Sequence, residues 1–393
     1  GSIYAFSSNP AVTTASFAAA NIFNNQGSIL STVLPANLTG FTTNAVSNLN
    51  LSLTALNQIV NMGTISSAGN LSLTAGNSIV NQSVISAAQN LNIASVLGSV
   101  TNSGIMSAAA GNLNISSLVN SNLLVNNLGG RMEALLGTIS MSTSSTIEKL
   151  NLGVFGGDLL ARELNFHSNN GTVDLNVQEL SGMVNVSACA SHIEASTANL
   201  NLGQFKLSGD PTFYNTGGDI TINSNLDFSP IDFVSVPVAL AVVAQGNVTA
   251  ASGVNTISVS SAPNATGWPG DSFAGSILIV AGAAFTATPD NSPVSTTAPT
   301  PPPTAPPVGN AASVLTITGG SSGGGNIQLS GVNISSSAGF TNATSATAGD
   351  VTLVAYAGTT NNGNISVGNI TTGEFNPPTN DNTGLNGSVA IVG

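Results

Sequence analysis

The sequence predicts an all-β fold, a parallel β-helix in which coils of about 20 residues stack on one another. The first observation is a repeat, because residues 50–69 align with residues 70–89 without a gap and Asn61 then matches Asn81. The second is the alternation of apolar residues with Ser, Thr and Asn inside each coil, which is typical of strands with one buried face. The third is the Asn, Gly and Gln residues between these runs, which predict turns.

The composition limits the kinds of partner that the chain can have. Only 5% of its 393 residues are charged, against about 25% in typical soluble proteins. No window approaches the ~18 unbroken apolar residues of a spanning helix, so we expect no membrane span. Residues 1–130 contain no Asp, Glu, Lys, Arg or His, and the net charge is −12. A nucleic-acid partner is not expected, because binding to the phosphate backbone needs clustered Lys or Arg.

The N-terminal part begins with two apolar stretches that lack glycine, residues 3–6 and 11–20. We expect residues 1–21 to form a cap, or a strand segment that is exchanged with a neighbouring subunit. The β-helix itself is predicted for residues 22–229. Its repeat signature is an apolar residue, Asn, then Gly or Ser, then Ile or Val, and it already occurs in residues 23–29, which match residues 60–65.

The clearest coils lie between residues 48 and 130 and open with Asn-Leu at positions 50, 70, 90 and 112, which are 20, 20 and 22 residues apart. Three short strands per coil are expected. Within one coil the alternation predicts which side chains point inward. These are Leu71, Leu73, Ala75, Ile79 and Ile85.

Asn61, Asn81 and Asn102 recur at one place in successive coils. They predict an asparagine ladder along the solenoid. One interpretation is a polar stripe that binds a ligand. The other is structural, with each Asn at a left-handed turn position and hydrogen-bonded to the next one.

From residue 131 the repeat becomes less regular, while the strand pattern continues to residue 229. The stretch GGRMEALLG around Arg131 predicts a short helical turn. Further strands with an insertion are expected in residues 230–288. Residues 289–309 form a Pro/Thr-rich loop or linker, since proline is not tolerated in a central strand. Strands return in residues 310–393, where they continue or cap the solenoid.

The residues that could serve an enzyme lie between positions 158 and 194. A coil of about 20 residues places Asp174 one coil from Glu194, and Asp158 one coil from Glu179. Such carboxylate pairs are the kind that β-helix lyases and glycosidases use, whereas charged turn residues that face water explain the same pattern without catalysis. We expect no catalytic site. The candidates are Asp158, Arg162, Glu163, His167, Asp174, Glu179, His192 and Glu194.

Metal and cofactor motifs are weak. His167 and His192 lack the spacing of zinc ligands. Residues 380–384 (NDNTG) are compatible with a calcium site or with a plain turn. The single cysteine, Cys189, cannot form an intramolecular disulfide and is expected to be buried. We therefore expect no cofactor and no metal site.

Residues 69–87, GNLSLTAGNSIVNQSVISA, resemble the repeats of filamentous-haemagglutinin-type exoproteins. Those repeats combine a Gly-Asn-Leu-x-Leu strand with Asn-x-Gly-x-Ile. The resemblance is close over residues 22–120 and looser over residues 120–229. It implies a right-handed parallel β-helix in a secreted bacterial adhesin, and hence an extracellular or cell-surface location.

These patterns favour a structural protein that polymerises outside the cell, through stacking of the β-helix or through strand exchange with copies of itself. An adhesin module that binds surface glycans is the alternative. A polysaccharide-degrading enzyme built on Asp174 and Glu194 is the third hypothesis. The residues expected to take part in assembly are Ile3, Tyr4, Ala5, Phe6, Val389, Ala390, Ile391 and Val392.

Overall fold

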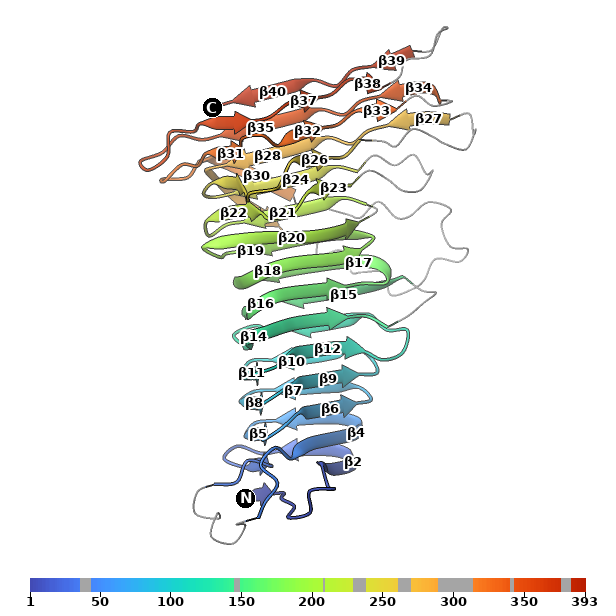
Figure 1. The fold of residues 1–393 in the computed structure, drawn as a ribbon, viewed down its shortest axis with the longest axis vertical. Helices are drawn as coiled ribbons and strands as arrows, with labels where there is room; N and C mark the ends of the chain where they lie inside the picture. The colour runs from blue at the N-terminus through green and yellow to red at the C-terminus, as the bar shows by residue number, and fades with distance from the viewer. Residues whose placement is uncertain are drawn as a thin grey trace. The chain divides into compact units, whose positions relative to one another are not determined.

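In the computed structural model, the described residues form forty strands and no helix (Figure 1). They are divided between two compact units, residues 1–171 with 175–183 and residues 172–174 with 184–393. The structure describes residues 1–35, 44–144, 149–207, 209–228, 238–260, 270–288, 314–339, 343–375 and 383–393. Across these residues, no helix is long and apolar enough to cross a membrane.

The first unit has three parallel sheets, which the chain visits in the order A, B, C. Sheet A contains the N-terminal parts of β2 (Thr14–Asn24) and β4 (Asn50–Asn61), then β6 (Leu71–Ala75), β9 (Leu91–Ser95), β12 (Leu113–Ser117) and the C-terminal parts of β14 (Arg131–Ser142) and β16 (Asp158–His167). Sheet B contains the C-terminal parts of β2 and β4, then β7 (Ser78–Asn81), β10 (Ser99–Asn102), β13 (Leu123–Asn126) and β15 (Leu150–Phe155). Sheet C contains β1 (Ser2–Tyr4), β3 (Ile29–Ser31), β5 (Thr64–Ser67), β8 (Val84–Ala87), β11 (Ile105–Ala108) and the N-terminal parts of β14 and β16.

The second unit repeats the arrangement with sheets D, E and F. Sheet D contains β19 (Ala190–Ala195), β21 (Pro211–Asn215), β24 (Leu240–Ala244), β28 (Ile277–Ala281), β35 (Val351–Ala355) and β40 (Val389–Val392). Sheet E contains β20 (Asn199–Leu207), β22 (Asp219–Ile222), β25 (Val248–Ala250), β31 (Ile327–Leu329) and β36 (Ile365–Val367). Sheet F contains β23 (Leu226–Asp227), β26 (Thr256–Ser258), β32 (Asn333–Ser335) and β37 (Ile370–Thr371).

Two of the remaining strands, β17 (Asn170–Val177) and β18 (Glu179–Ala188), pair with β15 and β16 and contribute residues to both units. In the second unit, a parallel sheet contains β27 (Gly270–Phe273), β34 (Ala343–Thr347) and β39 (Thr383–Leu385), and a smaller one contains β33 (Ala338–Gly339) and β38 (Glu374–Phe375). An antiparallel hairpin is formed by β29 (Ala283–Thr288) and β30 (Val314–Gly320).

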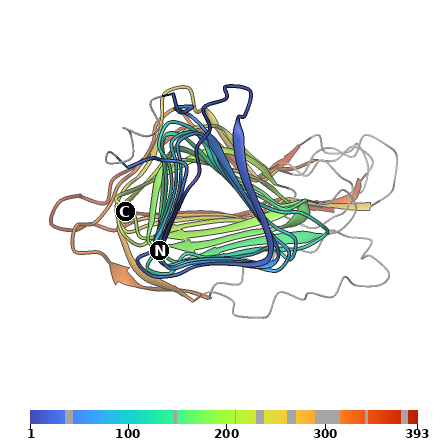
Figure 2. The same ribbon diagram turned by 90° about the horizontal axis from the view of Figure 1, so that it is seen from below.

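The register of the first unit confirms the predicted parallel β-helix. Leu51 pairs with Leu71, Ile59 with Ile79 and Asn61 with Asn81, as the gapless repeat requires. Each regular coil has three short strands, and Figure 2 shows the coils of this unit superposed as a triangle. The five side chains predicted to point inward are all 0–1% exposed. Burial of such apolar columns stabilises each coil by about 25 cal/mol per Å² of apolar surface, which only stacking provides.

Two local predictions are wrong. The stretch around Arg131 forms β14 instead of a helical turn, because Arg131 and Met132 pair with Ile105 and Met106 of β11 and the sheet overrides local helix propensity. The predicted alignment at residues 23–29 is shifted by one position at its end, where Leu30 pairs with Ile65. In the segment 1–21, predicted as a cap or an exchanged strand, β1 pairs with β3 and β2 pairs with β4, with a register shift between Ala19 and Asn21.

The second unit has an outer apolar layer in addition to its interior core. Tyr214, Val243 and Val280 on the outer side of sheet D are 0–4% exposed. They pack against the β29–β30 hairpin through Phe285, Ile317 and neighbouring apolar residues. β29 lies in residues 230–288, where further strands with an insertion are predicted, and β30 lies in the C-terminal stretch 310–393. The Pro/Thr-rich stretch 289–309 lies between these two strands in the sequence and outside the described residues.

Candidate functional site

The asparagine ladder of the first unit is buried and continuous. The amide nitrogen of Asn61 donates to the amide oxygen of Asn81 at 2.8 Å, and Asn81 donates in the same way to Asn102 at 2.8 Å. Sequence reasoning missed the two outer members. Asn24 donates to Asn61 at 2.7 Å and Asn102 donates to Asn127 at 2.7 Å. The sequence nevertheless contains the same pattern of an apolar residue followed by Asn at both places. It occurs as Phe23-Asn24 and as the Asn126-Asn127 pair after Val125.

The second amide hydrogen of each ladder residue goes to a backbone carbonyl. Asn61 donates to the carbonyl of Val84 at 2.9 Å, and Asn81 to that of Ile105 at 3.0 Å. Asn61, Asn81 and Asn102 are 0% exposed, so they cannot bind an external ligand. The structural interpretation therefore holds. Its left-handed geometry does not, because the non-glycine residues with positive φ in the described chain are Asn120 and Asn170.

A second row of asparagines opens the coils of sheet A. The side-chain oxygen of Asn50 accepts the backbone N–H of Asn70 at 2.7 Å, and the oxygen of Asn70 accepts that of Asn90 at 3.1 Å. The second unit uses the same device on sheet E, where Asn326 accepts the N–H of Asn364 at 2.9 Å. Each oxygen accepts from the following rung. This row gives the stack a polarity.

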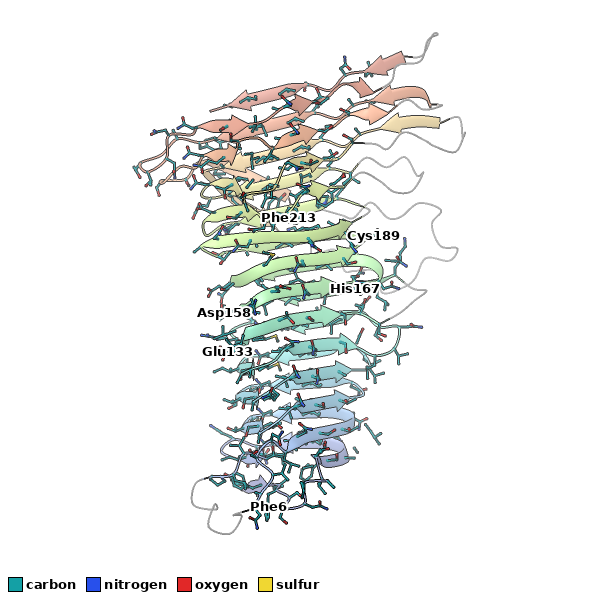
Figure 3. All side chains as sticks on the ribbon, in the orientation of Figure 1. Phe6, Glu133, Asp158, His167, Cys189 and Phe213 are labelled. Atoms are coloured by element: carbon teal, nitrogen blue, oxygen red, sulfur yellow. The ribbon has the colours of Figure 1, made fainter. Side chains whose placement is uncertain are left out.

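At its N-terminal end the first unit exposes interior side chains. Ile3 pairs with Leu30 and continues the interior column of Leu30 and Ile65, yet it is 56% exposed. Of the other predicted assembly residues, Tyr4 and Ala5 are half-buried, and Phe6 beyond the strand is 56% exposed (Figure 3). Among the described pairings, β1 and β2 each have a partner on one side only.

The last rung of the second unit shows the same feature. Val389 and Ile391 of β40 pair with Val351 and Leu353, whose side chains are 0% exposed and point inward. Val389 is 46% exposed and Ile391 53%. Ala390 and Val392 alternate with them and point to the outer side of sheet D. In the described chain β40 pairs with β35 alone.

Apolar side chains also gather around one coil of the first unit. Leu118 and Val119 lie at the turn between β12 and β13, and Leu128 lies at the turn between β13 and β14. Leu135 and Leu136 lie in β14, where the strand passes from sheet C to sheet A. Their exposed fractions range from 42% to 70%. All three corners of this coil are therefore apolar, and we call these five residues the leucine girdle.

The second unit brings Asp174, His192 and Glu194 together. The Nδ1 atom of His192 lies 2.9 Å from the Oδ1 atom of Asp174. The imidazole is buried against the edge of the Tyr214 ring, at a centroid distance of 5.8 Å. Burial is the main cause that raises the pKa of Glu194; the charge of Asp174 raises it further, whereas His192 lowers it. The predicted one-coil spacing of Asp174 and Glu194 thus places both carboxyls beside one histidine.

The geometry of this cluster does not favour catalysis. The Nε2 atom of His192 is buried and has no hydrogen-bond partner among the described residues. General acid or base catalysis requires a group within hydrogen-bond reach of a bound substrate. An imidazole whose free nitrogen is covered does not meet that condition.

The other predicted charged candidates lie on the surface of the first unit. Asp158 and Glu179 open the paired strands β16 and β18, one rung apart as predicted, and the N–H of Glu179 donates to the carbonyl of Gly157 at 3.3 Å. Arg162, Glu163 and His167 are exposed on β16. Figure 3 shows Glu133 and Asp158 on successive rungs. Glu133 forms an ion pair with Arg131 at 2.9 Å, which is worth little at an exposed position.

In the part of the chain that the structure describes, no three His, Cys, Asp or Glu residues are arranged to hold a metal ion. Asn380, Asp381 and Asn382 of the calcium motif lie outside the described residues. Cys189 is buried, as expected. Comparison of the chain with protein-family models, curated proteins and solved structures found no match.

Proposed function

We propose that this protein is an extracellular structural subunit that assembles with copies of itself into a filament or surface layer. The observation that carries this proposal is the leucine girdle, which exposes apolar side chains on a unit whose residues 1–130 contain no Asp, Glu, Lys, Arg or His. Contact with a second copy would bury these side chains.

The surface of the first unit supports lateral contacts between filaments. Residues 1–130 carry no Asp, Glu, Lys, Arg or His, so copies do not repel one another there. The leucine girdle exposes apolar side chains at three corners of one coil. Apolar patches of this kind are typical of protein–protein contacts. The resemblance of residues 69–87 to secreted exoprotein repeats favours an extracellular location.

The test is the replacement of Leu136 in the leucine girdle by Asp. An unpaired carboxylate buried in a contact between copies costs several kcal/mol, so we expect Leu136→Asp to raise the concentration needed for filament formation at least about tenfold. Leu56→Asp is the matched control, because Leu56 is 76% exposed and lies outside the girdle. Sedimentation and electron microscopy across a concentration series give the measurement. Monomers of the wild-type protein at every concentration, or equal effects of the two variants, would contradict the proposal.

A further inference from the structure

The first unit contains a lysine whose head group is buried. The basic residues of the chain are Arg131, Lys149, Arg162 and Lys206. Arg131 forms an ion pair with Glu133, and Arg162 and Lys206 are exposed. The Nζ atom of Lys149, in contrast, is buried and has no hydrogen-bond partner among the described residues. Because burial of an uncompensated charge is strongly unfavourable, this nitrogen needs a partner of opposite charge.

A second buried donor lies one rung further along the same unit. Asn169 is in the turn between β16 and β17, and its Nδ2 atom is also buried without a partner in the described part of the chain. Backbone hydrogen bonds fix this turn to the residues around Lys149. The N–H of Leu150 donates to the carbonyl of Asn169 at 3.0 Å, and the N–H of Asn169 donates to the Oγ1 atom of Thr143 at 3.0 Å. Lys149 and Asn169 are therefore neighbours on the paired strands β15 and β17.

On this basis we infer that Lys149 and Asn169 form a binding site for a small inorganic anion of the size of chloride. Both groups without a partner are donors, because a lysine head group has three N–H donors and no acceptor, and the asparagine nitrogen has two N–H donors. A water molecule would accept a hydrogen bond from them but would leave the charge of the lysine uncompensated. An anion satisfies the hydrogen bonds and the charge together.

The burial of the two nitrogen atoms selects a monoatomic anion. Sulfate and phosphate carry several acceptor oxygens that each need a donor, and a closed site with two donor groups does not supply them. An anion at this position contacts the residue before β15 and the residue before β17. It therefore links two successive rungs in the part of the first unit where the sequence repeat is less regular.

Thermal unfolding of the full chain at constant ionic strength and pH tests the site, with sodium chloride replacing sodium gluconate, whose anion is too large for a closed site. A ligand that binds the folded state stabilises it, so we expect the melting temperature to rise by about 2–4 °C towards saturating chloride. Lys149→Met removes the charge and should abolish this rise. Asn169→Leu removes one donor group and should raise the chloride concentration at half-maximal effect at least about fivefold.

Lys206→Met is the matched control, because it removes an exposed lysine and should keep the full chloride response. The linewidth of the chloride NMR signal is a second readout, which the wild type should broaden and Lys149→Met should not. An equal response of Lys149→Met and the wild type, or its loss in Lys206→Met, indicates a general salt effect and overturns the site. A wild type without a chloride response also overturns it. Glu148→Gln then tests whether the neighbouring carboxylate, which lies outside the described residues, is the partner of Lys149.

Discussion

The last inward-facing position of each rung differs between sheet B of the first unit and sheet D of the second. In sheet B Asn61, Asn81 and Asn102 occupy it and form a buried chain of amides. In sheet D Asn215 is followed on the next strand by Ala244, and Ala281 pairs with Ala355. These alanines are 0–4% exposed, so the corner is closed without any polar group.

Asn215 shows how a buried amide is satisfied without a ladder. Its nitrogen donates to the carbonyl of Asp219 at 2.6 Å, and its oxygen accepts the N–H groups of Thr197 and Gly217 at 3.1 and 3.2 Å. A buried amide needs all its partners, from other amides or from the backbone. The comparison teaches that stacked rungs are held either by a continuous polar ladder or, as beyond Asn215, by apolar layers on both sides of a sheet.

The largest expected effect comes from breaking the ladder. Asn81→Leu leaves one N–H of the Asn61 amide without an acceptor and removes the amide donor of the Asn102 oxygen, which keeps only the N–H of Gly104 at 3.3 Å. Each unsatisfied buried group costs about 1–3 kcal/mol, so we expect the free energy of unfolding to fall by about 2–5 kcal/mol. Urea denaturation gives the magnitude, and hydrogen exchange at β7 and β10 shows where the loss occurs.

Ala281→Asn is the reciprocal control for that experiment. It places an amide in a buried corner whose paired residue, Ala355, has no group to receive it. Burial of an unpaired amide destabilises by about 1–3 kcal/mol. If Asn81→Leu is neutral and Ala281→Asn is tolerated, the ladder and the apolar corner are interchangeable and the comparison fails.

A smaller effect is expected from the outer layer of the second unit. Phe285 of the hairpin lies 5.9 Å from the ring of Tyr214 between centroids and is half-buried. Phe285→Ala removes this contact, and because Phe285 is already partly exposed we expect a loss of about 1–2 kcal/mol. Hydrogen exchange should increase in β29 and β30 and stay unchanged in β6 to β10. Faster exchange in the first unit would contradict the statement that the hairpin stabilises the second unit alone.

The smallest effect concerns pH. Burial raises the pKa of Glu194 above its ordinary value of 4.5. The folded state therefore binds this proton more tightly than the unfolded state, and its stabilising contribution is present below pH 4.5 and lost as the pH rises through the folded pKa. Thermal unfolding of the wild type and of Glu194→Gln at pH 4 and pH 7 gives the measurement. We expect the melting temperature of the variant, relative to that of the wild type, to be higher at pH 7 than at pH 4. Parallel curves would show that Glu194 is not desolvated.

The regular coils could be predicted from sequence because their period is constant. With no insertion between Leu71 and Leu91, the alternation alone determines both register and burial. Arg131 was mispredicted because local helix propensity favours a turn that strand pairing overrides. The outer layer was also beyond prediction. Strands such as β28 are apolar on both faces, and such a run does not reveal which partner covers the second face.

Of the candidate residues, those whose position depends on the coil length were placed well. The ladder position followed from Asn61 and Asn81, although its outer members were missed. The proximity of Asp174 to Glu194 also followed from coil length. The contact of His192 with Tyr214 depends on how the two rings are oriented, which no period describes.

The absence of Asp, Glu, Lys, Arg and His before residue 131 has a consequence for how these coils respond to their solution. No side chain in them changes charge between about pH 3 and pH 9, and no side-chain ion pair within them can be weakened by salt. Acid, brine and fresh water should therefore leave the cohesion of these coils unchanged.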